Sequence, residues 1–264
     1  MKQSVEFIKI WGSNILAWSF NFSHIGDAYG YFKEFLAIVG IAGASGYSAM
    51  RAIIYFKDNR HKLGFKKNEM EKVIILDNGH GIDTNGKRSP IWDDGTQLFE
   101  WDFNRQIVRK IANHLRASHI PYHVLVPEEN DVSLKERCVR ANKFSKDSLL
   151  ISVHGNAFNG QAHGYEVFTS EGLTKSDPIS QVFFEEMKDM FPDKKMRTDY
   201  SDGYADKEAR FTIITKTKMP AVLTENFFFD NEEDCKLMMS EKGQDMIALA
   251  HFNAITKCIK KGLY

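Results

Sequence analysis

The sequence lacks an excess of charge of either sign, because its 264 residues include 35 lysines and arginines and 35 aspartates and glutamates. Nucleic acid favours a basic protein face, so this balance gives no indication of a nucleic-acid partner. Its three cysteines are far apart and outside any C-x-x-C pair, which favours neither a disulfide framework nor a thiolate metal site. Internal repeats are lacking too. The length fits one main domain with an appendage, since domains usually run to about 100–200 residues.

The first 56 residues differ in composition from the rest and predict an N-terminal helical segment. Apolar residues at alternating spacings of three and four, as on one face of an amphipathic helix, are Ile8, Trp11, Ile15, Trp18 and Phe22. Residues 35–56 are mostly apolar and carry no charge except at Arg51, and these roughly 22 residues are near the ~20 that a helix needs to cross a bilayer. We therefore expect a transmembrane helix at 35–56, followed by a lysine-rich linker at 57–72.

From residue 73 onward, short apolar runs alternate with helical patterns. Runs that predict strands, several of them apolar almost throughout as in strands covered on both faces, occupy residues 73–77, 122–126, 149–153, 164–169, 211–215 and 221–225. Helical periodicity between them predicts helices at 98–118, 132–145, 178–191 and 241–261. This alternation indicates an α/β domain at residues 73–264, with a twisted, largely parallel sheet of about six strands flanked by helices.

Three of the predicted strands lead into residues that can carry chemistry. In open α/β sheets, ligands bind beyond the carboxyl ends of the strands, where loops present side chains above a rigid platform. His80 follows the first strand, His154 follows the third, and Glu225 ends the last. Glycines flank both histidines and leave room there for a bound atom. Two imidazoles and a carboxylate are thus expected at one edge of the sheet.

Glu100 lies in the first turn of the helix after the first strand, from where its carboxylate can return over the same edge. Two histidines and one carboxylate are the ligand set of a catalytic zinc site, so we expect one Zn²⁺ bound by His80, Glu100 and His154. Zinc lowers the pKa of a bound water to about 7 and makes it a nucleophile at neutral pH. Glu225 is then the candidate acid/base residue.

Each of these residues alone has an ordinary structural explanation. A histidine at a strand exit is more often a hydrogen-bonded structural residue, Glu100 suits a helix N-terminus, and Glu225 could cap the loop that follows it. Four such residues at one edge favour the catalytic interpretation. We interpret four other histidines as packing or surface residues, namely His114, His119, His123 and His251.

These motifs resemble the zinc-dependent N-acetylmuramoyl-L-alanine amidases of bacterial cell-wall hydrolases and phage endolysins, from residue 73 to about residue 261. The family's Asp-Pro-Gly-His-Gly is similar to residues 77–81, with asparagine in place of proline. Its zinc glutamate resembles Glu100 in LFEWDFN, and its second histidine resembles His154 in ISVHGNA. The segment KMPAVLTEN resembles the one that carries the catalytic glutamate, here Glu225.

The resemblance implies that the substrate is peptidoglycan and that the bond cut joins the lactyl group of N-acetylmuramic acid to L-alanine. Polar contacts to the stem peptide are expected from Arg88, Asn156, Asp199 and Arg210. Two alternatives stay open, a zinc peptidase or deacetylase on another amide substrate and a catalytically inactive cell-wall binding module.

The resemblance also bears on partners and location. Some members of this family are blocked by an extra helix until a partner displaces it, but residues 170–210 show only one regular helix, so we expect no activator protein. The enzyme is expected at the bacterial inner membrane, acting on the cell wall. The basic stretch after residue 56 would place the amidase in the cytoplasm by the positive-inside rule, which leaves the side of the membrane open.

Overall fold

The computed structural model describes residues 3–11, 14–22 and 72–264. By its internal contacts the chain divides into two compact units, residues 1–68 and 69–264. The predicted transmembrane helix at 35–56 and the predicted linker at 57–72, apart from Lys72, lie outside the described residues. Among the residues that are described, no helix is long and apolar enough to span a bilayer.

The described part of the first unit is a pair of antiparallel strands, β1 (Gln3–Trp11) and β2 (Asn14–Phe22). The amphipathic helix predicted here is therefore wrong. The sequence also contains a period of two, the period of a strand, at Leu16, Trp18, Phe20 and Phe22. Aromatic and β-branched residues are enriched in strands, so this second period and the composition favour pairing over a helix.

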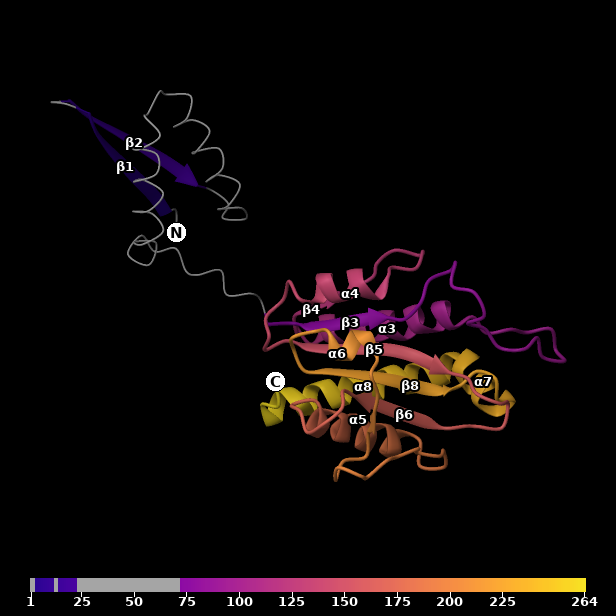
Figure 1. The fold of residues 1–264 in the computed structure, drawn as a ribbon. Coiled ribbons are helices and arrows are strands. Elements are labelled where there is room, and N and C mark those ends of the chain that lie inside the picture. The colour runs from indigo at the N-terminus through magenta and orange to yellow at the C-terminus, as the bar shows by residue number, and fades with distance from the viewer. Residues whose placement is uncertain (1–2, 12–13, 23–71) are drawn as a thin grey trace. The chain divides into compact units, whose positions relative to one another are not determined.

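The second unit contains a six-stranded sheet in the order β4-β3-β5-β8-β6-β7 (Figure 1). These strands are β3 (Ile74–Asn78), β4 (Tyr122–Val124), β5 (Leu149–Asn156), β6 (Tyr165–Thr169), β7 (Lys207–Glu208) and β8 (Ala221–Phe228). Strands β4, β3, β5 and β8 are mutually parallel, whereas β6 pairs antiparallel with β8 and parallel with β7. The six-stranded α/β sheet flanked by helices is confirmed, although the sheet is mixed.

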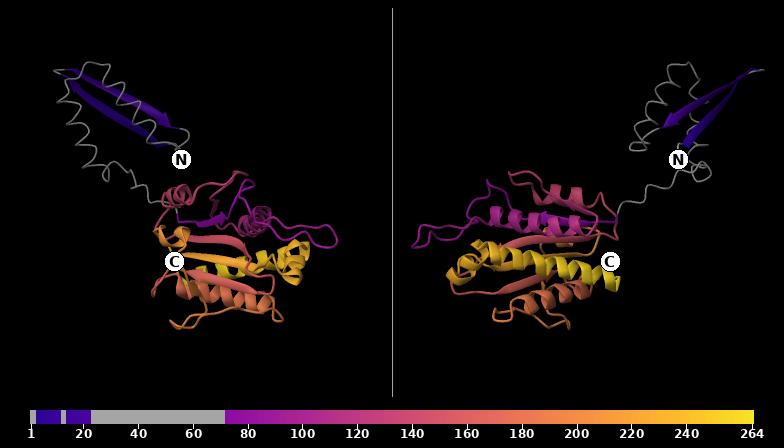
Figure 2. Two further views of the ribbon diagram at one scale, coloured as in Figure 1. Left: turned by 45° about the vertical axis from the view of Figure 1, so that its right-hand side comes forward. Right: turned by 180° about the vertical axis from the view of Figure 1, so that it is seen from behind.

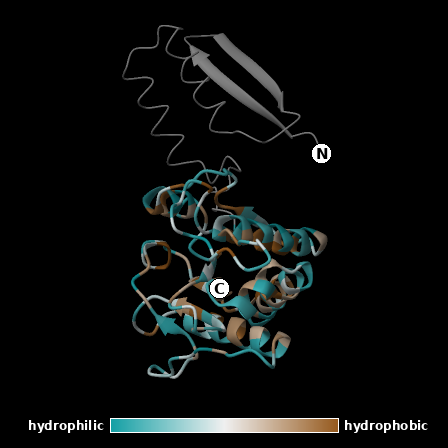
Figure 3. Cartoon of the chain, turned by 90° about the vertical axis from the view of Figure 1, so that its right-hand side faces the viewer, coloured by the Kyte–Doolittle hydropathy of each residue, from teal (hydrophilic) through white to brown (hydrophobic). Residues whose placement is uncertain are grey.

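Helices cover both faces of this sheet (Figure 2). One face packs against α3 (Glu100–Ala117), α5 (Asp177–Met190) and α8 (Glu241–Lys261), which is preceded by α7 (Glu232–Met239). The other face packs against α4 (Leu134–Ala141) and α6 (Thr212–Thr215). The helices carry both hydrophilic and hydrophobic residues along their length (Figure 3), as expected where one side packs on a sheet. The domain therefore has three layers.

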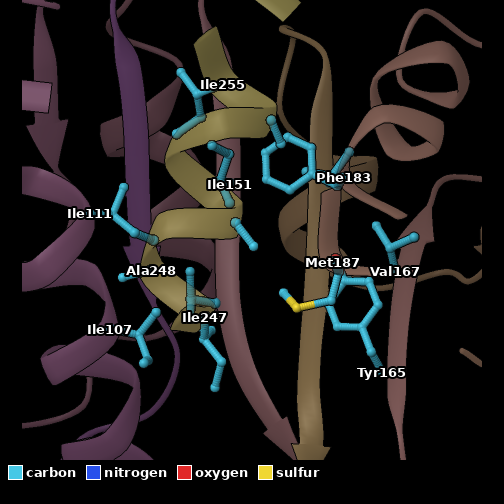
Figure 4. Close-up of a cluster of buried hydrophobic side chains, with 14 of the residues drawn as sticks. Ile107, Ile111, Ile151, Tyr165, Val167, Phe183, Met187, Ile247, Ala248 and Ile255 are labelled. Carbon is cyan, nitrogen blue, oxygen red and sulfur yellow. The ribbon is translucent and has the colours of Figure 1, made fainter. Parts of the chain in front are cut away.

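The larger part of the core lies between the sheet and the layer of α3, α5 and α8 (Figure 4). Ile151 of β5 and Val167 of β6 belong to one buried cluster with side chains from all three helices, including Ile107, Phe183 and Ile247. Burial of each such side chain contributes roughly 1.5–3 kcal/mol to folding. This packing fixes the strands whose ends carry the candidate site.

The strand predicted at residues 211–215 is wrong, because these residues form the short helix α6. An apolar run of this length does not distinguish a strand from a buried helical turn by periodicity alone. Ile213 and Ile214 are both buried in the cluster on the α4 face, and a helical turn lets two consecutive residues share that cluster. The two-residue strand β7 and the helix α7 were not predicted.

Candidate functional site

The carboxyl ends of β3, β5 and β8 meet at one edge of the sheet, as their parallel pairing requires. His80 lies two residues after β3, His154 lies near the end of β5, and Glu225 lies in β8 as the direct register partner of His154. Glu100 is the first residue of α3. The fold thus places all four residues that the sequence singled out at the same edge.

His80, Glu100 and His154 have ligand-forming atoms that all lie within 4.8 Å of one another. The Oε1 atom of Glu100 is 3.0 Å from Nδ1 of His154 and 3.3 Å from Nε2 of His80. Two ligands about 2.0–2.1 Å from a tetrahedral zinc are roughly 3.3 Å apart, so these separations suit that metal. The buried Oε2 atom of Glu100 has no hydrogen-bond partner, with Lys87 Nζ 3.7 Å away as an ion-pair partner, so this oxygen keeps acceptor capacity for a metal ion. The three residues therefore fit a zinc ion.

The protonation of Glu100 is set by its two histidine neighbours. Burial alone would raise the pKa of this carboxyl group, but hydrogen bonds from His154 and His80 outweigh burial and hold its pKa well below the usual range. In return, Glu100 outweighs the effect of burial on His154 and raises the pKa of that imidazole. Glu100 is therefore an anion at neutral pH, as a metal ligand must be.

Two arginines fix the backbone at His80. This residue has φ of 63°, in the left-handed region that residues other than glycine rarely adopt. Its carbonyl oxygen accepts hydrogen bonds from Arg105 Nη1 at 3.0 Å and from Arg137 Nη2 at 3.3 Å. Arg137 is itself buried and forms an ion pair of 2.6 Å with Asp77 of β3. These contacts hold the imidazole in place despite the strained backbone.

Gly79 provides the space in which the two imidazoles approach each other. Their ring centroids are 5.0 Å apart, and a Cβ atom added at Gly79 would lie 2.0 Å from Cε1 of His154. The Gly79 carbonyl accepts a hydrogen bond from the Asn104 amide at 3.0 Å. Only glycine fits at this position while His154 keeps its place.

Glu225 lies in a different environment from Glu100. Burial raises the pKa of Glu225 to about 8, and the negative charge of Glu100 acts in the same direction. Its buried Oε2 atom has no hydrogen-bond partner. On the other side of β8, its register partner on β6 is Glu166. Two carboxyl groups of one site thus have opposite pKa shifts, which is typical of an acid/base residue beside a metal ligand.

The four predicted substrate contacts lie in differing surroundings. Arg210 forms an ion pair with Glu171 at 2.8 Å and its side chain is 83% exposed. Arg88 is exposed in the loop before α3, and Asp199 is exposed and accepts a hydrogen bond from the Ser201 backbone at 3.0 Å. Asn156 differs, because its amide donates to Oε2 of Glu166 at 2.8 Å.

Two neighbours of the site were missed in the sequence. Lys87 Nζ lies 3.7 Å from Oε2 of Glu100, and Glu166 lies beside Glu225. A glutamate within the apolar strand GYEVFT was a usable signal, because a charged residue is rarely buried without a partner or a role.

Comparison with known proteins agrees with this geometry. Residues 74–257 match the family model described as N-acetylmuramoyl-L-alanine amidase. The endolysin of Bacillus phage SPP1 is 30% identical over 195 residues, covering 72% of this chain and 67% of the endolysin. The amidase CwlM of Bacillus licheniformis is 29% identical over 187 residues, covering 70% of this chain and 67% of CwlM.

Solved structures share the fold. An N-acetylmuramoyl-L-alanine amidase from Clostridium difficile 630 has a TM-score of 0.59 at 24% identity, covering 72% of this chain and 97% of that one. The amidase AmiC2 of Nostoc punctiforme has a TM-score of 0.61 at 21% identity, with the same two coverages. The chain therefore belongs to the N-acetylmuramoyl-L-alanine amidase family of enzymes, which hydrolyse peptidoglycan in the cell wall.

Proposed function

We propose that this amidase uses one zinc ion, held by His80, Glu100 and His154, with Glu225 as its acid/base residue. The observation that carries the proposal is the approach of both imidazoles to one buried, ionised carboxylate, at 3.0 and 3.3 Å. When bound, zinc would polarise the scissile carbonyl and make a water molecule acidic. The bond cut is the amide between the lactyl group of N-acetylmuramic acid and L-alanine.

Glu225 would move the protons of this reaction. Its raised pKa of about 8 means that its carboxyl group exchanges a proton near neutral pH in the environment that the protein alone provides. A bound dication would lower that value and favour the carboxylate that accepts the proton. The unpartnered Oε2 atom is free to give the proton to the leaving nitrogen.

Analysis of digested cell wall tests this proposal. Purified full-length protein with zinc is added to peptidoglycan, and the soluble products are identified by mass spectrometry. Free stem peptides beginning with L-alanine are expected, and a chelator should abolish their release. Fragments cut within the stem peptide or lacking an acetyl group would instead indicate a peptidase or a deacetylase, and binding without any product would indicate an inactive module.

The enzyme is proposed to act without an activator protein. Between residues 170 and 210, the structure contains one helix, α5, and the short strand β7. Among these described residues no second helix is available to cover the ligands. Activity of the purified protein with zinc and no other protein supports this, whereas activity that depends on an added cell extract contradicts it.

Anchoring to the membrane through residues 35–56 also stays a proposal. Its support is compositional, because this run contains Arg51 as its single charged residue. Tyr55 and Phe56 at its end suit the interface between lipid and water. The anchor would hold the enzyme at the bacterial inner membrane, while its substrate is the cell wall.

A further inference from the structure

A buried carboxylate next to the candidate site forms ion pairs with two cationic side chains. Glu166 of β6 is 4% exposed. Its Oε1 atom lies 2.5 Å from Arg197 Nε and 2.6 Å from Lys207 Nζ, and its Oε2 atom accepts a hydrogen bond from the Asn156 amide at 2.8 Å. Both carboxylate oxygens of Glu166 are thus engaged with the protein. We call Glu166, Arg197 and Lys207 the β6 cluster.

The β6 cluster has one positive charge left over, because two cations share one carboxylate. Arg197 uses Nε for its ion pair, and no hydrogen bond or ion pair joins its terminal Nη atoms to any residue in the described part of the chain. Both cationic side chains are 27% exposed, so solvent and ligands reach them. The guanidinium also lies over the ring of Phe228, 5.3 Å from its centroid. A fixed guanidinium with a free fork is suited to bidentate binding of a carboxylate.

The register of the sheet gives the distance from this cluster to the metal ligands. Glu166 is the partner of Glu225, and Glu225 is the partner of His154. Neighbouring strands are about 4.8 Å apart, so Glu166 lies roughly 10 Å from His154 across the sheet. An extended peptide spans about 3.3–3.6 Å per residue. A peptide that leaves the scissile bond along this row therefore reaches the β6 cluster with its second or third residue.

We propose that Arg197 and Lys207 bind a free carboxylate of the leaving peptide, two or three residues beyond the scissile amide. This specificity site rests on the function proposed above. A carboxylate would neutralise the surplus charge, which an uncharged sugar could not do. The buried Glu166 acts as a positioning residue, since it holds Arg197 through Nε and leaves the two terminal Nη groups for the ligand.

A pair of synthetic substrates tests this without altering the protein. Both are muramoyl peptides, and each is offered to the full-length enzyme with zinc. In one substrate the second and third peptide residues have free carboxylates, and in the other the same groups are carboxamides. Because a hydrogen bond to a charged group is the stronger kind, we expect kcat/KM to be at least about tenfold higher for the carboxylate form. Equal values for the two substrates would overturn the subsite while leaving the proposed function intact.

Variants then assign the preference to residues. Arg197→Gln should reduce the ratio of kcat/KM for the carboxylate substrate to kcat/KM for the carboxamide substrate toward one. Glu166 keeps Lys207 as its partner in this variant, so its charge stays compensated. The matched control is Arg140→Gln, because Arg140 is similarly accessible, with 25% of its side chain exposed, and pairs with the exposed Glu128 away from β6, so it should not affect the preference.

Lys207→Gln provides a second variant if Arg197→Gln unfolds, and thermal unfolding of each variant checks this. A preference that survives in both variants contradicts the assignment. Failure of the unmodified enzyme to cut either substrate would contradict the proposed function itself, and with it the subsite.

Discussion

His154 and Glu225 are direct partners in the parallel register of β5 and β8. Side chains of register partners lie on the same face of a sheet, so backbone pairing places the imidazole beside the carboxyl group. The β-bulge that follows His154 in β5 interrupts this register only beyond the pair. Strands are more rigid than loops, and the relative position of these two groups is therefore fixed by the core of the domain.

Although His154 and Glu225 are neighbours, we predict that zinc binding depends on His154 and proton transfer depends on Glu225. Glu225→Gln keeps the shape of the side chain but cannot transfer a proton, so turnover should fall by about 10²–10⁴ while zinc content stays at one ion per chain. Substituting His80, Glu100 or His154 with alanine should lose both zinc and turnover. Elemental analysis of the purified variants, together with turnover, checks this. A Glu225→Gln protein that contains no zinc would show that Glu225 is a ligand.

Gly79→Ala should weaken zinc binding without touching a ligand. The new Cβ atom would lie 2.0 Å from Cε1 of His154, so the ring or the strand has to move. We expect zinc affinity to fall by about tenfold or more, the effect seen when outer contacts of metal ligands are lost. Competition with a fluorescent chelator measures it.

The control for that substitution is Gly160→Ala. Gly160 has a φ of 74°, a backbone conformation that favours glycine. A Cβ atom added there would lie 3.6 Å from the nearest atom, the carbonyl oxygen of Asp230, which is an ordinary contact distance. It should lose a little stability and bind zinc normally. Equal zinc affinity in the two variants would mean that space at Gly79 does not position His154.

Arg137 is predicted to contribute far more to the free energy of unfolding than Arg140 on the same helix. Arg137→Met leaves Asp77 buried without its cation, which should lower the free energy of unfolding by about 3–5 kcal/mol. Arg140 pairs with the exposed Glu128 at 2.8 Å, and Arg140→Met should cost less than about 1 kcal/mol. Urea unfolding of the two variants gives the comparison. Similar losses would show that the Asp77 pair contributes no more than a surface ion pair.

Much of the candidate site could be predicted from the sequence, because its residues lie at the ends of strongly apolar strands. His80, His154 and Glu225 follow such runs, and the topology of parallel strands brings those ends together. The β6 cluster could not be found in this way. It depends on β6 running antiparallel to β8, and an apolar run carries no information about the direction of its strand.

Short and doubly periodic segments account for the wrong secondary structure. Four of the five residues at 211–215 are β-branched, which favours a strand, yet burial of both Ile213 and Ile214 on the α4 face stabilises a helical turn. In residues 3–22, spacings of three and four coexist with a period of two, and the sequence alone did not decide between them. Tertiary packing and strand pairing made the difference in both cases.

The proposed anchor predicts how the full-length chain behaves in cells. The full-length chain should sediment with membranes and need detergent for release. A chain without residues 1–71 should remain in the soluble fraction. Adding protease to intact spheroplasts then reports the side on which residues 72–264 lie. Recovery of the full-length chain in the soluble fraction without detergent would contradict a transmembrane helix at 35–56.

The last prediction concerns His251 of α8, which is 1% exposed. Its Nδ1 atom lies 2.8 Å from the Ile247 carbonyl oxygen and so carries the proton, while Nε2 accepts from the Thr224 hydroxyl at 3.0 Å. Burial lowers the pKa of this imidazole to about 4, from about 6.5 in an unfolded chain. Above pH 6.5 it is neutral in both states and adds no pH dependence.

Between pH 6.5 and 4 the unfolded chain binds a proton at this residue and the folded chain does not. Stability therefore falls as the pH falls, by up to about 1.4 kcal/mol per pH unit and roughly 3 kcal/mol in all. Urea unfolding of the unmodified protein and of His251→Gln at a series of pH values gives the free energy of unfolding as a function of pH. Its slope should be shallower in the variant by up to about 1.4 kcal/mol per pH unit, the effect of one bound proton. His163→Gln, at an exposed histidine, is the control and should keep the original slope. Identical slopes for all three proteins would mean that His251 is protonated in the folded state.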